Sequence, residues 1–298
     1  MKLYFKNHID AQERKMPELA YLNGEIMPIE KAFVPIEDRG YQFGDAVYEY
    51  IASHDGKMFF VDDHLSRLER SLQELSFPKV SLKTVKSAVE KLFSESQIKR
   101  AGIYIQISRA VDQRDHAYSN KGPVQIVMTV RSLPERHIHA NNGAAAITME
   151  DYRWNRCDIK TVQLLPNILS KQKAVDQGAY DTIFISKDKI VREATSSNVF
   201  IVKNGSVVTH PLTNNILPGI TRKVILEICQ DKNIPFKERF FSLTDLYDAD
   251  EVFLSGTTTE VLPIVSIDSK AIADEKPGKL TKILYNELRL KAGVKKAL

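Results

Sequence analysis

Apolar and polar residues alternate in several segments between residues 21 and 131, and this period of two predicts β-strands. Residues 21–29 contain an Asn-Gly dipeptide and residues 46–60 contain an Asp-Gly dipeptide, each between apolar runs. Both dipeptides favour tight hairpin turns. Two further strands are predicted at 101–110 and 123–131. The pattern therefore predicts a sheet built largely from hairpins in the amino-terminal part.

Two helices interrupt this pattern. In residues 62–77, leucines at positions 65, 68, 72 and 75 recur at the helical spacing and mark one apolar face. Residues 81–98 begin with Ser81, a favourable N-cap residue. A mixed α/β domain is thus expected before residue 132.

The polar, turn-rich stretch 132–143 predicts a linker between two α/β halves. The expected order is an amino-terminal extension (1–16), a smaller α/β domain (17–131), this linker, and a larger carboxy-terminal domain (144–298). In the second half, strands and helices alternate without a Gly-x-Gly-x-x-Gly motif or a P-loop, which argues against a nucleotide-binding fold.

Composition narrows the class of protein. Of 298 residues, 43% are apolar and 27% charged, as in ordinary globular proteins, and the formal charge of +4 argues against nucleic-acid binding. The two cysteines do not form a disulfide framework, so a reducing cytoplasm fits. No secretory signal or membrane span is expected from the hydropathy pattern.

Some polar residues are placed where chemistry is possible, but spacing alone leaves their roles open. In a strand, Tyr48 and Tyr50 share one face and Glu49 takes the other, which fits structural tyrosines equally well. His64 and Arg67 lie beside the leucine stripe, where a solvated flank is favoured.

Two further segments have donors suited to anions. In LPGITR (217–222), Gly219 precedes a predicted helix whose first N–H groups, with the Thr221 hydroxyl, suit a phosphate, although an ordinary helix start is favoured. SGTTTE (255–260) offers similar donors or a polar turn. Arg114 and His116 share a face if extended, although a solvated loop is favoured.

Seven segments in this order resemble those of the class IV (fold type IV) pyridoxal-phosphate aminotransferases, and most closely those of the D-amino-acid transaminases. They are DRGYQFGDAVYEY (38–50), HLSRL (64–68), QISRAVDQRDHAY (106–118), RWNRCDIKTVQLLPNIL (153–169), VREATSSNVFIV (191–202), ILPGITR (216–222) and LSGTTTEVLPI (254–264). The resemblance runs from about Tyr21 to the carboxy terminus and leaves residues 1–16 outside.

The resemblance implies a two-domain α/β (α+β) fold, with a smaller amino-terminal domain and a larger, barrel-like domain that binds pyridoxal 5′-phosphate. Lys160 would be the Schiff-base lysine, and Glu193 would face the pyridine nitrogen. The cofactor phosphate would be held by Arg67, Ile220, Thr221 and Thr257. Tyr48, with Arg114 and His116 of the facing subunit, would bind the substrate carboxylate. No metal is implied, and a homodimer with its active sites at the interface is expected.

The implied reaction is amino transfer between a D-amino acid such as D-alanine and a 2-oxo acid such as 2-oxoglutarate. The alternatives are a 4-amino-4-deoxychorismate lyase, a branched-chain L-amino-acid aminotransferase and, more distantly, a non-enzymatic binding module. One departure is Tyr50, which stands where the D-amino-acid enzymes carry a small aliphatic residue and which would narrow the side-chain pocket if it pointed there.

Overall fold

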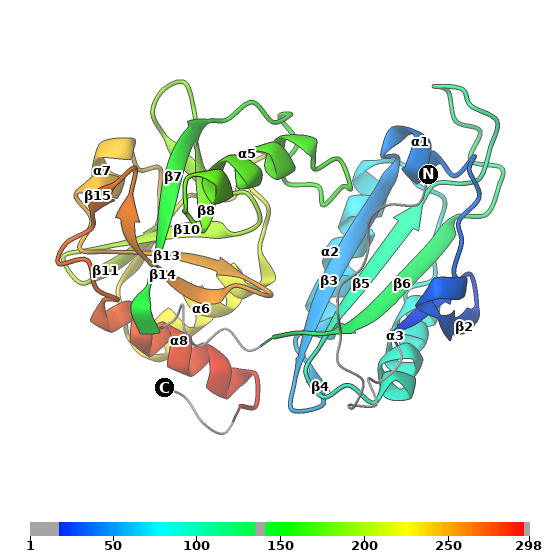
Figure 1. The fold of residues 1–298 in the computed structure, drawn as a ribbon, viewed down its shortest axis with the longest axis horizontal. Coiled ribbons are helices and arrows are strands. Elements are labelled where there is room, and N and C mark those ends of the chain that lie inside the picture. The colour runs from blue at the N-terminus through cyan, green and yellow to red at the C-terminus, as the bar shows by residue number, and fades with distance from the viewer. Residues whose placement is uncertain (1–17, 135–140, 295–298) are drawn as a thin grey trace, which may run out of the picture.

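A computed structural model of the protein describes residues 18–134 and 141–294. The described chain forms two halves that lie side by side, each built around its own sheet (Figure 1). The predicted extension at residues 1–16 lies outside the described residues.

The first half is an antiparallel six-stranded sheet in the order β2-β1-β6-β5-β3-β4. Its strands are β1 (Leu19–Leu22), β2 (Glu25–Pro28), β3 (Ala46–His54), β4 (Lys57–Met58), β5 (Ala101–Ser108) and β6 (Gln125–Ser132). The helical segments are η1 (Ile29–Lys31), α1 (Arg39–Phe43), α2 (Val61–Glu74) and α3 (Leu82–Ser96). Both predicted hairpin turns are confirmed, at Asn23-Gly24 and Asp55-Gly56.

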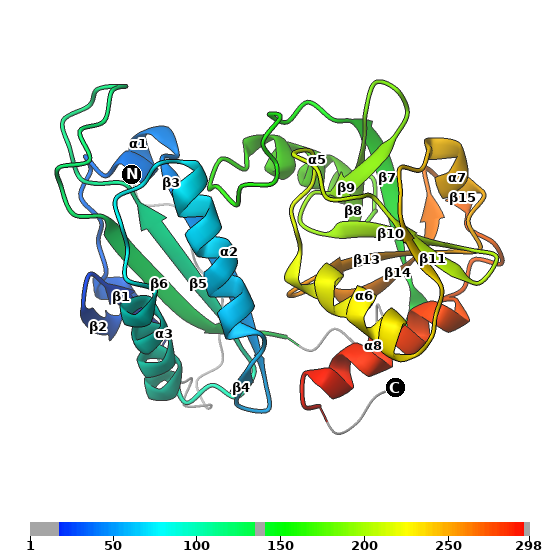
Figure 2. The same cartoon turned by 180° about the vertical axis from the view of Figure 1, so that it is seen from behind.

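Helices α2 and α3 cover one face of this sheet (Figure 2). The predicted leucine stripe of α2 is confirmed, because Leu65, Leu68 and Leu72 are buried against Val47 and Ile51 of β3. The other face of β3 carries Tyr48 and Tyr50.

The second half contains six strands that close on themselves in the order β10-β13-β14-β7-β8-β9, with β9 pairing back to β10. Its strands are β7 (Ala144–Glu150), β8 (Asp181–Ile185), β9 (Val191–Ala194), β10 (Asn198–Lys203), β11 (Ser206–Thr209), β12 (Phe236–Glu238), β13 (Glu251–Gly256), β14 (Glu260–Ile267) and β15 (Lys270–Ala271). Its helices are α5 (Leu165–Asp176), α6 (Ile220–Asp231), α7 (Leu243–Tyr247) and α8 (Lys279–Lys291).

Apolar residues fill the closed sheet, and a second core lies between its outer surface and helices α6 and α8. The expected two-part α/β fold with a barrel-like second half is therefore confirmed. The predicted linker falls between β6 and β7, but it is only partly within the described residues, so its boundaries stay a prediction. Among the described residues, no helix combines the length and apolarity that a membrane crossing requires.

Candidate active site

A cavity of about 600 Å³ lies where the two halves meet. Seven of the nine residues to which the resemblance gives a role line it: Tyr48, Arg67, Lys160, Glu193, Ile220, Thr221 and Thr257. These residues come from β3 and α2 of the first half and from four separate segments of the second. The fold therefore collects side chains that are up to about 200 positions apart in the chain.

The segment that carries Lys160 is attached to the first half, although it belongs to the second half in sequence. The Lys160 carbonyl accepts a hydrogen bond from the Tyr48 N–H at 3.0 Å, and the Lys160 N–H donates to the Ser71 hydroxyl at 3.3 Å. Thr161 forms a bridge with Val47. The Lys160 Nζ atom lies 4.2 Å from the centre of the Tyr48 ring, in the cavity. These bonds fix the base of the lysine side chain.

Glu193, on β9, forms the acidic end of the cavity. Its carboxylate accepts hydrogen bonds from Arg153 at 2.6 Å, from the Leu217 N–H at 2.9 Å and from the Asn198 amide at 3.2 Å. Burial raises the pKa of Glu193, and the Arg153 guanidinium and the Leu217 N–H oppose that shift. A buried carboxylate held in this way can bind a cationic N–H group of a ligand.

Helix α6 points its amino terminus into the same cavity. Ile220 and Thr221 are its first residues, and no side chain caps their free N–H groups. Gly219 precedes them, and a Cβ atom there would lie 2.1 Å from Asn198 Oδ1. Any larger residue at position 219 would therefore clash with the Asn198 side chain. The uncapped helix terminus favours an anion.

Arg67 lies beside the helix terminus, and its side chain is buried. It donates two hydrogen bonds to Glu49, at 2.7 and 2.9 Å, and a third to the Pro218 carbonyl at 3.0 Å. His64 contacts Glu49 at 2.7 Å. Burial alone would raise the pKa of Glu49, but Arg67 and His64 hold it at about 2. The predicted solvated flank for His64 and Arg67 is wrong, because Glu49 of the underlying strand draws both side chains inward.

Tyr50 does not line the cavity. Its hydroxyl occupies the space above Gly102 on the neighbouring strand β5, where an added Cβ atom would lie 2.0 Å from it. In this conformation Tyr50 therefore does not narrow the side-chain pocket, as its position in the sequence had suggested it could. Tyr48, two residues earlier, points to Lys160.

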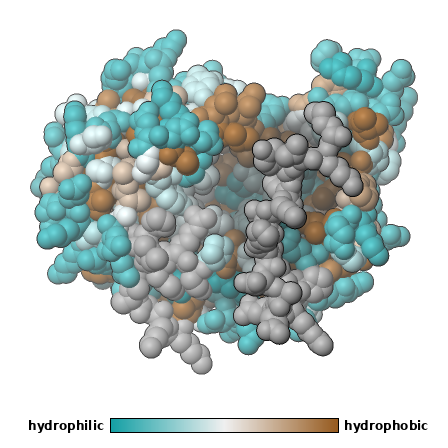
Figure 3. Space-filling model, in the orientation of Figure 1, coloured by the Kyte–Doolittle hydropathy of each residue, from teal (hydrophilic) through white to brown (hydrophobic). Residues whose placement is uncertain are grey.

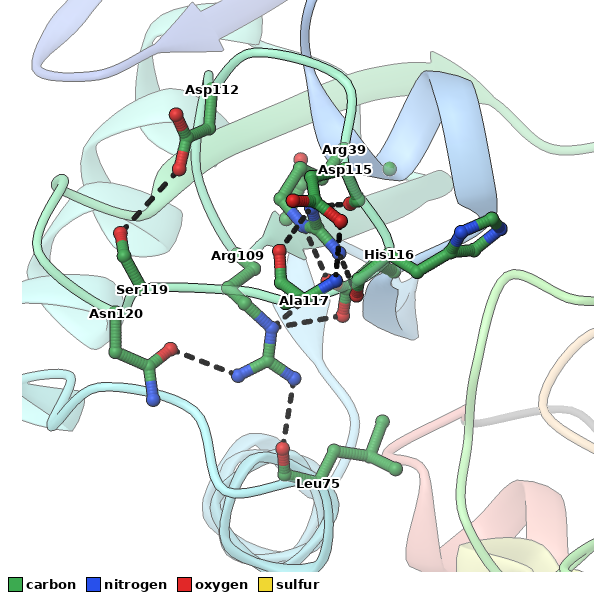
Figure 4. A network of polar contacts seen from close by, with 12 residues as sticks. Arg39, Leu75, Arg109, Asp112, Asp115, His116, Ala117, Ser119 and Asn120 are labelled. Atoms are coloured by element: carbon green, nitrogen blue, oxygen red, sulfur yellow. Dashed lines mark hydrogen bonds and ion pairs between the residues drawn. The ribbon is translucent and has the colours of Figure 1, made fainter.

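Arg114 and His116 do not line the cavity of their own chain. They lie in the exposed loop between β5 and β6, and both contact the ring of Phe43, a cavity residue, with centroid distances of 4.9 Å for Arg114 and 5.6 Å for His116. Figure 4 shows the His116 ring directed away from the body of the loop. Both side chains are available for contacts outside this chain.

Sequence reasoning missed Arg153, Asn198 and Glu49 as parts of the site. Each acts through a partner that is distant in sequence or on another element, and spacing gives no signal for such contacts. Within the described residues, no cluster of His, Cys, Asp and Glu is arranged to hold a metal ion.

Comparisons with known proteins identify the family. The sequence pattern described as "Amino-transferase class IV" matches residues 46–267. A D-alanine aminotransferase of Bacillus licheniformis is 40% identical over 271 residues, which are 90% of this chain and 94% of that protein. A D-alanine aminotransferase of Staphylococcus aureus strain N315 is 41% identical over 269 residues, 90% of this chain and 95% of that protein.

Among solved structures, the branched-chain amino acid aminotransferase of Escherichia coli has a TM-score of 0.87 at 23% identity, covering 94% of this chain and 96% of that chain. At this identity the likeness concerns the fold alone. The match to the family pattern includes all seven of the predicted site residues that line the cavity. The resemblance seen in the sequence is confirmed, and the chain belongs to the class IV aminotransferases.

Proposed function

We propose that the protein is a pyridoxal-phosphate-dependent D-amino-acid transaminase, which exchanges the amino group of a D-alanine-type donor with a 2-oxo acid. The single observation that carries this proposal is the identity of about 40% to D-alanine aminotransferases over nine-tenths of the chain. The convergence of Lys160, Glu193 and the α6 terminus in one cavity agrees with it. A cytoplasmic location stays a prediction.

The cavity suits pyridoxal phosphate chemically. A lysine amine suits its aldehyde, a buried carboxylate suits its pyridine N–H, and an uncapped helix terminus with Arg67 suits its phosphate. All of these groups line one cavity, as a ligand with three different ends requires. Thr221 and Thr257 add hydroxyl donors at the phosphate end.

Each residue then has a defined task. The Lys160 amine would hold the cofactor at rest and, once the substrate amine has replaced it, move the proton at the substrate Cα. When bound, the cofactor ring supplies an electron sink for the pair left at that carbon. Glu193 would hold a proton on the ring nitrogen, which strengthens the sink. Arg67 and the N–H groups of Ile220 and Thr221 would bind and orient the phosphate.

Recognition of the substrate carboxylate is assigned to Tyr48 of one chain and to Arg114 and His116 of a second copy. The exposed apolar residues near the cavity mouth support a homodimer: Leu165, Ile168 and Leu169 of α5 are 65%, 59% and 55% exposed in the single chain. Figure 3 shows apolar side chains at the top of the molecule, next to the hollow between the halves. Such a patch favours a partner protein surface.

Complementation between an inactive variant, Lys160→Ala, and an impaired variant, Arg114→Ala, tests this assignment. Lys160→Ala and Arg114→Ala subunits are mixed, dissociated and reassociated. If Arg114 serves the neighbouring site, each hybrid dimer contains one site with both residues intact, and D-alanine turnover returns. If activity does not rise above that of the separate variants although hybrid dimers form, Arg114 does not act across the interface.

The two rival enzymes are distinguished by substrate. A branched-chain aminotransferase would convert L-leucine and 2-oxoglutarate, whereas a 4-amino-4-deoxychorismate lyase would release pyruvate from its substrate without a 2-oxo acid. Assays of wild-type protein with D-alanine, L-leucine and aminodeoxychorismate separate the three. Turnover of D-alanine well above the other two is expected.

A further inference from the structure

The loop that carries Arg114 and His116 is long and exposed, yet it is tied to buried groups. It runs over residues 109–124, between β5 and β6, and residues 113–121 are all exposed. Loops of this length without secondary structure are uncommon and are often functional or disordered. This loop is instead fixed by two buried arginines, Arg39 and Arg109 (Figure 4).

Arg39 is the first residue of α1, and its side chain is only 4% exposed. Its guanidinium donates to the carbonyls of three consecutive loop residues: Asp115 at 2.7 Å, His116 at 3.3 Å and Ala117 at 3.5 Å. The Arg39 guanidinium therefore holds the loop backbone immediately after Arg114.

The charges of Arg39, Arg109 and Asp45 explain why Arg39 and the loop backbone stabilise each other. The Nε atoms of Arg39 and Arg109 both donate to the Asp45 carboxylate at 2.9 Å. One carboxylate shared by two buried guanidinium groups does not balance both positive charges. The carbonyl oxygens of residues 115–117 therefore provide further acceptors for the Arg39 guanidinium. A lysine would keep the charge, but it lacks the rigid fork that reaches several carbonyls at once.

The side chains that leave this part of the loop gather on one aromatic ring. Phe43, at the end of α1, has the Arg39 guanidinium 4.8 Å and the Arg114 guanidinium 4.9 Å from its centroid, with the His116 ring also alongside. Arg39 thus sets the backbone, and Phe43 supplies a surface against which Arg114 and His116 rest.

We infer that Arg39 is a positioning residue for recognition of the substrate carboxylate, acting through Arg114 and His116. The loop is set before the substrate arrives, so the two donors lose little conformational freedom on binding. This inference rests on the proposed function. It adds that the preference for D-amino acids depends on a buried residue that touches neither substrate nor cofactor.

A double-mutant cycle tests the inference on the cofactor-loaded protein. Arg39→Lys is expected to lower kcat/KM for D-alanine about tenfold, the loss of one charge-assisted contact, and to lower the ratio of D-alanine to L-alanine turnover. In an Arg114→Ala background, Arg39→Lys should change kcat/KM less than about twofold. An equal loss in both backgrounds would overturn the inference.

Arg109→Lys is the matched control. Arg109 shares Asp45, but its other donors go to the carbonyls of Leu75 and Ser76, just after α2, and to Asn120 of the loop, and none goes to residues 114–117. If Arg39 only stabilises the fold, the two lysine variants should lose the same fraction of D-alanine turnover whenever their melting temperatures fall by the same amount. The positioning role predicts that Arg39→Lys loses more turnover and more D-over-L preference, and the absence of that difference would overturn it.

Hydrogen–deuterium exchange of the loop amides, followed by mass spectrometry, gives an independent readout, and residues 114–118 should exchange faster in Arg39→Lys than in wild type. An unchanged exchange rate would mean that Arg39 does not hold the loop. If Arg39→Lys does not fold, Asp45→Asn replaces it in the double-mutant cycle. Its effect on kcat/KM should also be smaller in the Arg114→Ala background than in wild type.

Failure of the proposed function would give different results. Wild-type protein would not turn over D-alanine, or Arg114→Ala alone would have no effect.

Discussion

Substitution of Gly219 by alanine probes the packing that joins the two ends of the cavity. The backbone of Gly219 has φ −65° and ψ 135°, which any residue can adopt, so the expected damage comes from space alone. The new Cβ atom would lie 2.1 Å from Asn198 Oδ1, whereas carbon and oxygen atoms in contact keep roughly 3.3–3.6 Å. The Asn198 side chain must therefore move.

The cost follows from the bonds that Asn198 makes. Its amide donates to the Leu217 carbonyl at 2.9 Å and to the Glu193 carboxylate at 3.2 Å, and Asn198 is buried. Losing one bond to a neutral acceptor and one to a charged acceptor gives about 2–4 kcal/mol. We expect Gly219→Ala to lower the free energy of unfolding in urea by this amount and to weaken binding of pyridoxal phosphate.

Asn198→Ala supplies the control, because it removes the atom that the new Cβ would meet. In that background, Gly219→Ala should cost less than about 0.5 kcal/mol. The reasoning is refuted if Gly219→Ala costs less than about 1 kcal/mol in the wild-type background, or if the costs of the two substitutions simply add.

Three further predictions concern single residues. Lys160→Ala should lose the visible absorption of the bound cofactor together with turnover, and a variant that transaminates at the wild-type rate would exclude Lys160. Glu193→Gln should retain the cofactor but slow a single-turnover half-reaction at least about tenfold, since the carboxylate shifts a neighbouring proton equilibrium by roughly 1–3 pK units; an unchanged rate would remove Glu193 from the mechanism. Glu49 has its pKa lowered from 4.5 to about 2, so it contributes stability that is present above pH 4.5 and is lost as the pH falls toward 2. The stability difference between wild type and Glu49→Gln, about 3 kcal/mol at pH 7, should therefore shrink in urea unfolding at pH 3, and a difference independent of pH would contradict this.

Local patterns predicted the elements that local physics determines. The Asn-Gly and Asp-Gly turns and the leucine stripe of α2 appear as expected, because turn geometry and helical period depend on neighbouring residues. The closure of the second sheet was not predictable in this way. It depends on the pairing of Glu193 with Asn198 across a tight reversal and on strands that are far apart in the chain.

The site shows the same division. Spacing placed Arg67 beside the leucine stripe and favoured solvent, whereas Glu49 beneath the helix draws it inside. The burial of Arg39 under the loop 109–124 has no periodic pattern either, because its partners are backbone carbonyls 76–78 residues away. Roles for Lys160 and Glu193 came from resemblance to the family, and composition or spacing alone singled out neither residue.

The most direct test of the central claim is the stereochemistry of amino transfer by the wild-type protein loaded with pyridoxal phosphate. D-alanine or L-alanine is incubated with 2-oxoglutarate, and the configuration of the glutamate product is determined by chiral chromatography. We predict pyruvate and D-glutamate from D-alanine, with little product from L-alanine. Formation of L-glutamate, or a preference for L-leucine over D-alanine as the amino donor, would contradict the assignment.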